Sequence, residues 1–463
     1  MNPQRSDAFV FFGASGDLAR KKIFPALQAL TGRGLLDMPV IGVARSGWTV
    51  EQLRAHVLEG LEQHGGVDRA AFAKLATRLV SVNGDYADPA TFVALRKALG
   101  EAAHPLHYLA IPPNMFETVA TGLGRSACAR GARIVVEKPF GRDLASARAL
   151  NATLHAVFDE SDIFRIDHFL GKEAVQNLVI FRFANTFLEP IWNSRFVDNI
   201  QITLAERFGV EGRGRFYEEA GAIRDVIQNH LLQVLGFLTM EPPAFTRHES
   251  ISGEQAKLFQ RIRPISPNAL VRGQFQGYRV EKDVAPDSTV ETFAAVRLHI
   301  ASPRWDGVPI LIRAGKCLAT TACEVVVTLK QPAMCGFPPG EPNFVRFRLS
   351  PEVTITIGAS VKRAGEAIAA EPVAFTVVHH PDGDEMDAYE RLLGDAMAGD
   401  AMLFAREDSV EAAWTIVQPI LGDVTPVHPY APGSWGPLEA EQIASDVGGW
   451  HQPVARRGDE SAS

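Results

Sequence analysis

Nine consecutive residues, RIDHFLGKE (165–173), bring an acid, an imidazole and a lysine close together in the chain. An apolar periodic stretch follows at 171–183 and predicts a helix that starts near Gly171. His168 and Lys172 can then converge on an anionic group, together with the free N–H donors of the helix start. The residues therefore indicate a phosphate site. A charged helix cap is the alternative interpretation.

A second candidate for chemistry is His230, in the segment IRDVIQNHLLQVLGFL (223–238). Apolar residues recur there at helical spacing and predict an amphipathic helix over 220–240. His230 lies on or beside the apolar stripe, where an imidazole is commonly a hydrogen-bonded core residue. An imidazole that faces a cleft and is oriented by a carboxylate acts instead as a general base. Asp167 is the candidate orienting carboxylate.

A small-residue loop, GASGDLA (13–19), follows an apolar strand near the N-terminus and opens a helix. Such a loop lets the backbone approach a pyrophosphate, which the free N–H groups and the positive end of the helix stabilise. Glycine turns between a strand and a helix are also common for steric reasons alone. The strand–loop–helix setting and the basic residues after the loop favour a dinucleotide site. These basic residues are Arg20, Lys21 and Lys22.

The end of the second apolar strand indicates which dinucleotide is bound. This position usually carries an acid that binds the ribose hydroxyl of NAD, but here the sequence is Ala44-Arg45-Ser46. An arginine can hold a 2′-phosphate through charge-assisted hydrogen bonds, so the sequence favours NADP over NAD. The alternative is a solvated loop arginine.

The segment VEKPFG (136–141) stands at the carboxyl end of another predicted strand, where ligands of open α/β sheets bind. Lys138 could contact both cofactor and substrate there, and Pro139 could form a cis turn that directs Lys138 inward. A surface loop is the alternative interpretation.

The elements that position these residues fall into two groups. Strands are predicted at 8–13, 38–46, 107–113 and 132–141, with helices at 51–64, 69–79, 89–100 and 115–130, an alternation typical of a doubly wound parallel sheet. After about residue 165 the chain becomes richer in strands, at 270–300, 308–314, 323–331, 344–358 and 371–379, with helices at 171–183, 220–240 and 384–421. We predict an α/β Rossmann domain at 1–165 and an α+β domain with a large, mainly antiparallel sheet at 166–463. The last residues, 455–463, are expected to be frayed.

Composition excludes several classes of protein. The 463 residues suit two or three domains at about 150 residues each. The net charge of −8 gives no reason to expect nucleic acid or an anionic membrane as a partner. The apolar run before the glycine loop is too short for a signal peptide or membrane span, which predicts a cytoplasmic protein. The cysteines, Cys128, Cys317, Cys323 and Cys335, have neither zinc-site nor disulfide spacing, and no metal is expected.

Taken together, the segments GASGDLA, EKPFG, RIDHFLGKE and RDVIQNH closely resemble the glucose-6-phosphate dehydrogenase family, and they occur in that family's order. The resemblance continues through 204–225, 308–316, 387–414 and 429–437, so it covers nearly the whole chain. RIDHFLGKE is highly specific for the family, whereas GASGDLA is much less so.

The resemblance implies oxidation of glucose 6-phosphate by NADP to 6-phosphoglucono-δ-lactone, the first step of the oxidative pentose phosphate pathway, in a homodimer or homotetramer. His230 is then the base that removes the C1 hydroxyl proton, and Asp167 orients it. The substrate residues implied are Lys138, His168, Lys172, Glu206, Asp225 and Lys316. The cofactor residues implied are Gly13, Ala14, Ser15, Gly16, Asp17, Leu18, Arg20, Arg45, Asp85, Tyr86 and Lys138.

Two departures from the family leave alternatives open. Phe169 stands where many members have a tyrosine that binds the phosphate, and a hydrogen bond of that kind is worth about 0.5–1.5 kcal/mol. Thr320 and Thr321 stand where a basic side chain is common. A relative that accepts NAD or another aldose is therefore one alternative. A catalytically silent protein that only binds these ligands is another, although such a protein would need no base at the reacting carbon.

Overall fold

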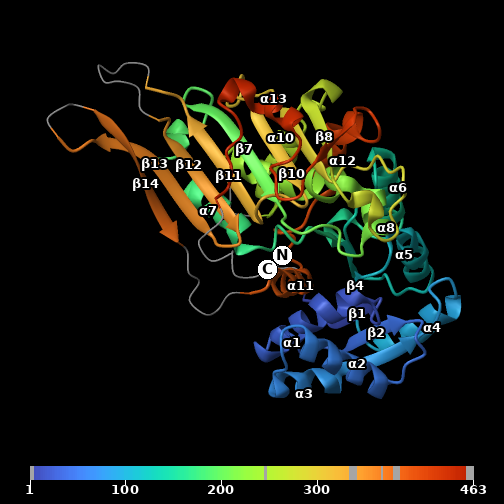
Figure 1. Cartoon of the computed structure of the whole chain (residues 1–463). Helices are drawn as coiled ribbons and strands as arrows, with labels where there is room; N and C mark the ends of the chain where they lie inside the picture. The colour runs from blue at the N-terminus through green and yellow to red at the C-terminus, as the bar shows by residue number, and fades with distance from the viewer. Residues whose placement is uncertain (1–4, 245–247, 333–340, 366–368, 379–385, 455–463) are drawn as a thin grey trace. The chain divides into compact units, whose positions relative to one another are not determined.

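The structure is a computed structural model that describes residues 5–244, 248–332, 341–365, 369–378 and 386–454 (Figure 1). The chain divides into two compact units, each built from segments that are not consecutive in sequence. Unit 1 comprises Met1–Glu173, Pro243–Ala256 and Asp384–Glu411; unit 2 comprises Ala174–Pro242, Lys257–Gly383 and Ala412–Ser463. The division into domains 1–165 and 166–463 stays a prediction. Residues 455–463 and Cys335 lie outside the described residues.

Unit 1 is built on a six-stranded sheet with the strand order β3-β2-β1-β4-β5-β6. Each pair of neighbouring strands is parallel. This is the order of doubly wound dinucleotide-binding folds, in which ligands bind outside the carboxyl ends of the strands where the order reverses, here between β1 and β4. The predicted Rossmann-type sheet is confirmed. Its strands are β1 (Ala8–Phe12), β2 (Val40–Ala44), β3 (Leu79–Asn83), β4 (Pro105–Leu109), β5 (Arg133–Glu137) and β6 (Ile163–Ile166).

The helices of unit 1 start where short polar side chains can accept backbone N–H bonds. Thr49, Asp68, Asp88 and Asp143 cap α2, α3, α4 and α6 in this way, which satisfies N–H groups that have no partner inside the helix. The helices are η1 (Ala19–Ile23, a π-helix), α1 (Phe24–Gly32), α2 (Val50–Gln63), α3 (Arg69–Arg78), α4 (Pro89–Leu99), α5 (Phe116–Arg125), α6 (Leu144–His155) and α11 (Ala388–Ala398).

Two strands of this sheet were not predicted. β3 begins directly where α3 ends and is only partly buried, so no change of period separates them in sequence. β6 has only four residues, and the charged Arg165 interrupts the apolar pattern that would predict a buried strand. That guanidinium is nonetheless buried and donates to Glu160 at 2.8 Å. The strand predicted at 107–113 instead ends at Leu109, and the helix predicted at 115–130 ends at Arg125.

Unit 2 contains a nine-stranded sheet with the order β14-β13-β12-β11-β7-β10-β9-β8-β15 (Figure 1). β10 pairs in parallel with β7, and β15 with β8, while the other pairs are antiparallel. The mainly antiparallel sheet is therefore confirmed. The strands are β7 (Val197–Ala205), β8 (Leu270–Phe275), β9 (Phe293–Leu298), β10 (Ile310–Gly315), β11 (Ala322–Leu329), β12 (Phe344–Ser350), β13 (Thr354–Lys362), β14 (Ala370–Val378) and β15 (Val427–Tyr430).

The segment predicted as a helix over 220–240 is helical, and its first half is a π-helix. The segment comprises the end of α8 (Gly214–Ala222), then η5 (Ile223–Leu231, a π-helix) and α9 (Leu232–Thr239). A π-helix bonds i to i+5 and is wider than an α-helix, so α-helical spacing does not fix the direction of His230. The remaining helices are α7 (Glu173–Ala184), α10 (His248–Phe259), α12 (Glu407–Val417) and α13 (Glu441–Ala444).

Among the described residues, no helix has the length and apolar character that a membrane crossing requires. Cys128, Cys317 and Cys323 are free thiols, and Cys128 and Cys323 are buried.

Candidate active site

The glycine turn after β1 has a conformation that only glycine adopts readily. Gly13 has φ of 87°, and a Cβ placed there would lie 2.2 Å from the carbonyl oxygen of Ala110. The turn closes through the Gly16 N–H, which donates to the Gly13 carbonyl at 2.9 Å. Gly13 therefore follows β1 at the position where the strand order reverses, with its backbone free of a side chain that would keep a ligand away.

Tyr86 and Asp85, after β3, join the glycine turn and Arg45 in one group. The Tyr86 hydroxyl accepts the Gly13 N–H at 3.0 Å and donates to the Val43 carbonyl at 3.2 Å. Arg45 lies over the Tyr86 ring at 5.7 Å and donates to Asp85 at 2.9 Å. The structure thus brings together four of the sequence-predicted cofactor residues from three strand ends.

Two other predicted cofactor residues make different contacts. Arg20 donates to Glu59 at 3.1 Å and to Gln63 at 2.6 Å, both on α2. Asp17 is largely exposed and pairs with Lys21 at 3.2 Å. The Arg20 guanidinium is therefore engaged by α2 in this structure, and its role toward a cofactor stays a prediction.

Lys138 follows β5, and the Lys138–Pro139 peptide bond is cis, as the sequence suggested. The preceding residue, Glu137, is buried, and burial raises its pKa to about 7. Its carboxyl group accepts the Tyr108 hydroxyl and also bonds Tyr389. The residue immediately before Lys138 in the chain thus carries a buried carboxyl group that is bonded by two tyrosines.

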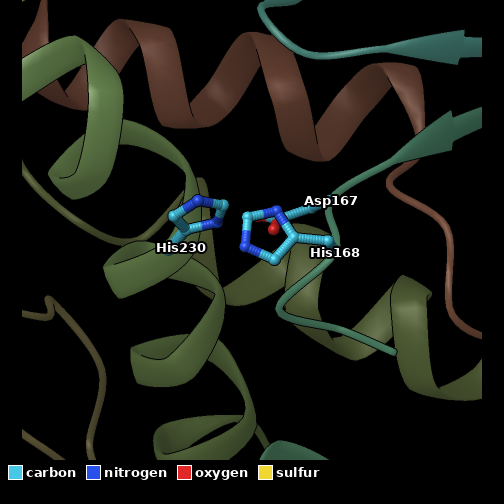
Figure 2. A group of neighbouring side chains, drawn as sticks. All are labelled: Asp167, His168 and His230. Carbon is cyan, nitrogen blue, oxygen red and sulfur yellow. The ribbon is translucent and has the colours of Figure 1, made fainter. Parts of the chain in front are cut away.

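Asp167 and His168 form the turn after β6. Asp167 is 2% exposed, and its Oδ1 accepts the Phe169 N–H at 3.0 Å. The His168 ring stacks on Tyr389 of α11, with ring centroids 6.4 Å apart and planes inclined by 10°. Figure 2 draws Asp167 and His168 together with His230 of η5. Asp167 belongs to unit 1 and His230 to unit 2, and their pairing is a proposal.

Phe169, where the resemblance leads one to expect a tyrosine, contacts Lys172. The Lys172 ammonium lies 3.9 Å from the centre of the Phe169 ring, a cation–π contact worth about 0.5–1 kcal/mol at exposed sites. α7 begins one residue later, at Glu173. Phe169 therefore helps to place the lysine although it lacks the hydroxyl that could bind a phosphate.

Glu206 and Lys316, both in unit 2, contact each other directly. Glu206 follows β7 and Lys316 follows β10; these strands are parallel neighbours, with Gly315 opposite Ala205. The Lys316 ammonium donates to the Glu206 carboxylate at 2.6 Å, although the residues are 110 positions apart. Lys316 also lies over the rings of Phe208 and Tyr217, at 4.9 and 5.3 Å. A partly buried pair of opposite charges can bind sugar hydroxyls as donor and acceptor.

Asp225 and His230 both lie on η5, which packs against β10. His230 is 3% exposed. Burial raises the pKa of Tyr217 well above its usual value, and the nearby carboxylates of Asp225 and Glu206 add to this rise. Tyr217 therefore lies among the predicted substrate residues of this unit as a neutral phenol.

Thr321, at a position where the resemblance leads one to expect a basic side chain, has a structural contact. The Thr321 hydroxyl accepts the N–H of Arg207 at 3.0 Å, and it thereby holds the backbone beside Glu206. The basic side chain expected at this position is absent, but its replacement still contributes to the geometry of the site.

One further group in unit 1 combines residues that can ligate metals. His155, Glu160 and Glu407 have ligand atoms within 4.8 Å of one another. Burial raises the pKa of Glu160, but the hydrogen bond and charge of Arg165 outweigh that effect and lower it. Because this guanidinium already occupies the carboxylate, the group gives no support for a metal site. The expectation of no metal stays a prediction.

Sequence reasoning missed Glu137, Tyr389 and Tyr217 as neighbours of the predicted residues. Tyr389 lies more than two hundred positions after His168 and carries no local motif for a site. Glu137 had one signal, because an acid at the end of a strand that is buried throughout needs a partner.

The parallel sheet with its glycine turn is typical of a dinucleotide-binding domain, and comparisons with known proteins show that the chain is an oxidoreductase. Residues 10–177 match the family model "Glucose-6-phosphate dehydrogenase, NAD binding domain", and residues 179–451 match "Glucose-6-phosphate dehydrogenase, C-terminal domain". The chain belongs to the glucose-6-phosphate dehydrogenase family, which confirms the resemblance of its motifs.

Relatives match the chain over nearly its full length. Glucose-6-phosphate 1-dehydrogenase 1 of Mycobacterium tuberculosis is 42% identical over 98% of both chains. The crystal structure of glucose-6-phosphate 1-dehydrogenase from Mycobacterium avium is 41% identical, with a TM-score of 0.91 over 98% of this chain and 100% of that one. A glucose-6-phosphate dehydrogenase in complex with its substrate is 34% identical, with a TM-score of 0.89 over 97% and 100%.

Proposed function

We propose that this protein is an NADP-dependent glucose-6-phosphate 1-dehydrogenase that oxidises glucose 6-phosphate to 6-phosphoglucono-δ-lactone. The observation that carries the proposal is the full-length match, since family models cover both units' site residues and a solved relative contains the substrate. The chain also contains the side chains that the proposed reaction needs.

His230 is the general base of this proposal. It takes the proton of the C1 hydroxyl as the C1–H bond breaks, so that the C1–O bond becomes the carbonyl of the lactone. Asp167 orients the imidazole and stabilises its protonated form. Both side chains are almost fully buried, and burial strengthens an electrostatic interaction between them. The nicotinamide cofactor, when bound, supplies the acceptor for the hydride that leaves C1.

The residues of unit 1 fit a dinucleotide with a 2′-phosphate. Gly13 must be a glycine because a Cβ there would meet the Ala110 carbonyl, and such a tight turn after β1 suits a pyrophosphate. Arg45 follows β2, where it can exchange its exposed partner Asp85 for a phosphate; an exposed ion pair of this kind is worth only about 0–1 kcal/mol. Lys138 lies beyond β5 at the same edge of the sheet.

The substrate residues divide into two sets in this proposal. His168 and Lys172 bind the 6-phosphate, with Lys172 supported by Phe169. Glu206, Lys316 and Asp225 bind the sugar hydroxyls. The ion pair between Glu206 and Lys316 fixes the position of each side chain relative to the other. A phosphate far from C1 can supply binding energy that positions the reacting carbon.

An absorbance assay at the reduced-nicotinamide band tests the proposal, with glucose 6-phosphate or glucose crossed with NADP or NAD. We expect rapid reduction with glucose 6-phosphate and NADP. Glucose oxidised as efficiently as its phosphate would contradict the roles of His168 and Lys172. No reduction with any combination would contradict the proposed reaction itself.

Arg45→Ala is expected to lower kcat/KM for NADP by about 10- to 100-fold and to change kcat/KM for NAD by less than about 3-fold. The lost interaction is a hydrogen bond between charged groups, worth about 1.5–3 kcal/mol, and NAD lacks the phosphate that makes it. Steady-state kinetics with both cofactors checks the result. Arg125→Ala, an exposed arginine on α5, is the matched control. Equal losses with both cofactors would contradict the assignment.

The exposed surface of β13 and β14 supports a homodimer or homotetramer. β14 is an edge strand, and Phe375 and Val377 on it are 60% and 67% exposed. A strand edge with exposed apolar residues favours pairing with another copy. Light scattering should give two or four times the chain mass of 50.4 kDa. A mass equal to one chain at assay concentration would contradict this part of the proposal.

A cytoplasmic location is also part of the proposal. A 38% identical relative from Arabidopsis thaliana is named "Glucose-6-phosphate 1-dehydrogenase 6, cytoplasmic", and the substrate and cofactor proposed are intracellular metabolites. Fractionation of cells that express the protein should place it with cytosolic markers, and recovery in the membrane fraction would contradict this location.

A further inference from the structure

The chain makes an abrupt break immediately before the π-helix that carries Asp225 and His230. Gly221, within α8, has φ of 62° and ψ of 176°, which are not helical values. A Cβ on Gly221 would lie 2.5 Å from Oε1 of Glu291. The backbone therefore approaches the Glu291 carboxylate as closely as only a glycine permits.

Glu291 satisfies the start of η5 from a distant part of the chain. Its Oε1 accepts the Ile223 N–H at 3.2 Å, and its backbone carbonyl accepts the Ala222 N–H at 3.0 Å. The residue that precedes η5 provides no side-chain cap of its own. Because the first N–H groups of a helix have no partners within it, Glu291 determines where the first turn of η5 lies.

The Glu291 carboxylate is itself held in a fixed position. It is 4% exposed, and Arg272 of β8, 2% exposed, donates to its Oε2 at 3.4 Å. Arg272 also donates to the carbonyls of Thr289 and Thr425, at 2.6 and 2.9 Å. Burial raises the pKa of Glu291, and the charge of Arg272 opposes this rise. A strand of the large sheet thus fixes the group that caps η5.

The next residue in the chain, Thr292, holds Lys316. The Thr292 carbonyl accepts the Lys316 N–H at 3.0 Å, and the Tyr430 hydroxyl donates to the Lys316 carbonyl at 2.7 Å while bonding the Thr292 hydroxyl at 3.0 Å. Two consecutive residues, 291 and 292, therefore connect the backbone of Lys316 with the first turn of the helix that carries His230.

We infer that Glu291, fixed by Arg272, is a positioning residue of this enzyme: it sets the start of η5 and thereby the positions of the Asp225 and His230 side chains relative to Lys316. The inference rests on the proposed function, in which His230 is the base. Glu291 touches no reacting group. A displacement of a catalytic group by about 1 Å can reduce a rate by about 100-fold.

The test compares three substitutions at Glu291 by their kcat, KM and pH profile of kcat. Glu291→Ala removes the acceptor of the Ile223 N–H and is expected to lower kcat about 100-fold and to shift the pH profile. Glu291→Gln keeps an acceptor at the same reach and should retain kcat within about 5-fold. Glu291→Asp keeps the charge but shortens the reach, and should lose more than the glutamine variant. KM for NADP should stay within about 2-fold in all three.

Glu218→Ala is the matched control. This carboxylate of α8 accepts the hydroxyls of Tyr278 at 2.7 Å and Ser288 at 2.6 Å. These bonds join α8 to the same loop, and neither of them reaches η5. Its loss should lower the melting temperature and leave kcat and the pH profile within about 3-fold of the parent enzyme.

Three results would overturn the inference. The first is a folded Glu291→Ala enzyme with unchanged kcat and pH profile. The second is an aspartate variant that is more active than the glutamine variant, because kcat would then depend on the charge at position 291 and not on the length of the side chain. The third is a control variant with the same loss of kcat. Glu291→Ala is the variant at risk of failing to fold, and the glutamine and aspartate variants still distinguish reach from charge.

A failure of the proposed function would be recognised separately. If the parent enzyme reduces neither NADP nor NAD with any sugar, the proposed reaction fails and kinetics no longer report on Glu291. The NMR signals of the His230 imidazole then provide the readout. They should move in Glu291→Asp and stay in place in Glu218→Ala, and signals unchanged in both would overturn the positioning role.

Discussion

Replacing His230 with asparagine is expected to lower kcat by about 10²–10⁴-fold while glucose 6-phosphate still binds with nearly unchanged affinity. General-base catalysis contributes a factor of this size, and asparagine has a similar shape but no basic nitrogen. The imidazole is 3% exposed on the π-helix, so bulk water does not readily take its place. Single-turnover kinetics and calorimetric binding of the substrate check the two parts of this prediction.

A second buried histidine provides the control for His230. His107 of β4 is fully buried and bonds the Cys128 carbonyl at 2.8 Å, and burial lowers its pKa to about 4. His107→Asn should reduce the melting temperature but leave kcat within about 3-fold. Near-normal turnover in His230→Asn would contradict the base assignment. Loss of substrate binding in that variant would instead indicate a structural role.

Lys172→Ala is expected to raise KM for glucose 6-phosphate by about 10- to 100-fold, with a smaller change in kcat. A hydrogen bond between charged groups is worth about 1.5–3 kcal/mol, and the Phe169 ring that holds the ammonium cannot replace it. The activity with glucose should not change, because glucose has no phosphate for Lys172 to bind. Steady-state kinetics with the two sugars measures the difference directly.

Lys74→Ala, an exposed lysine on α3, controls for the loss of one positive charge from the surface. This variant should match the parent enzyme with both sugars. A parallel loss of glucose and glucose 6-phosphate oxidation in Lys172→Ala would show that Lys172 supports the site in general and does not bind the phosphate.

The residues of each local motif were predictable because local chemistry fixes them. The glycine turn, the helix caps and the strand ends are properties of a few neighbouring residues, and Gly13 and Arg45 lie where their strands end, as predicted. Within the RIDHFLGKE segment, residues 168–171 form a turn before a helix, and that helix begins at Glu173, two residues after the predicted start at Gly171. The sequence did not predict β6, because this strand has only four residues and one of them is an arginine, which breaks the apolar pattern of a buried strand.

Other contacts depend on strand order and helix geometry, which the local pattern does not contain. Glu206 meets Lys316 only because β7 and β10 pair in parallel with Ala205 opposite Gly315. Tyr389 stacks on His168 although a long stretch of chain separates them. The π-helix of His230 arises where Glu291 satisfies its first turn.

By itself, the sequence determined the family and the two kinds of sheet, because spacing and residue type record these within short segments. It also gave the candidate residues for the chemistry, whose roles stay predictions. Tertiary structure alone decided how Glu206 is paired, which distant ring stacks on His168, and where the helix of His230 begins. These features require groups distant in sequence to share hydrogen bonds and buried charge, and no short segment specifies such partners.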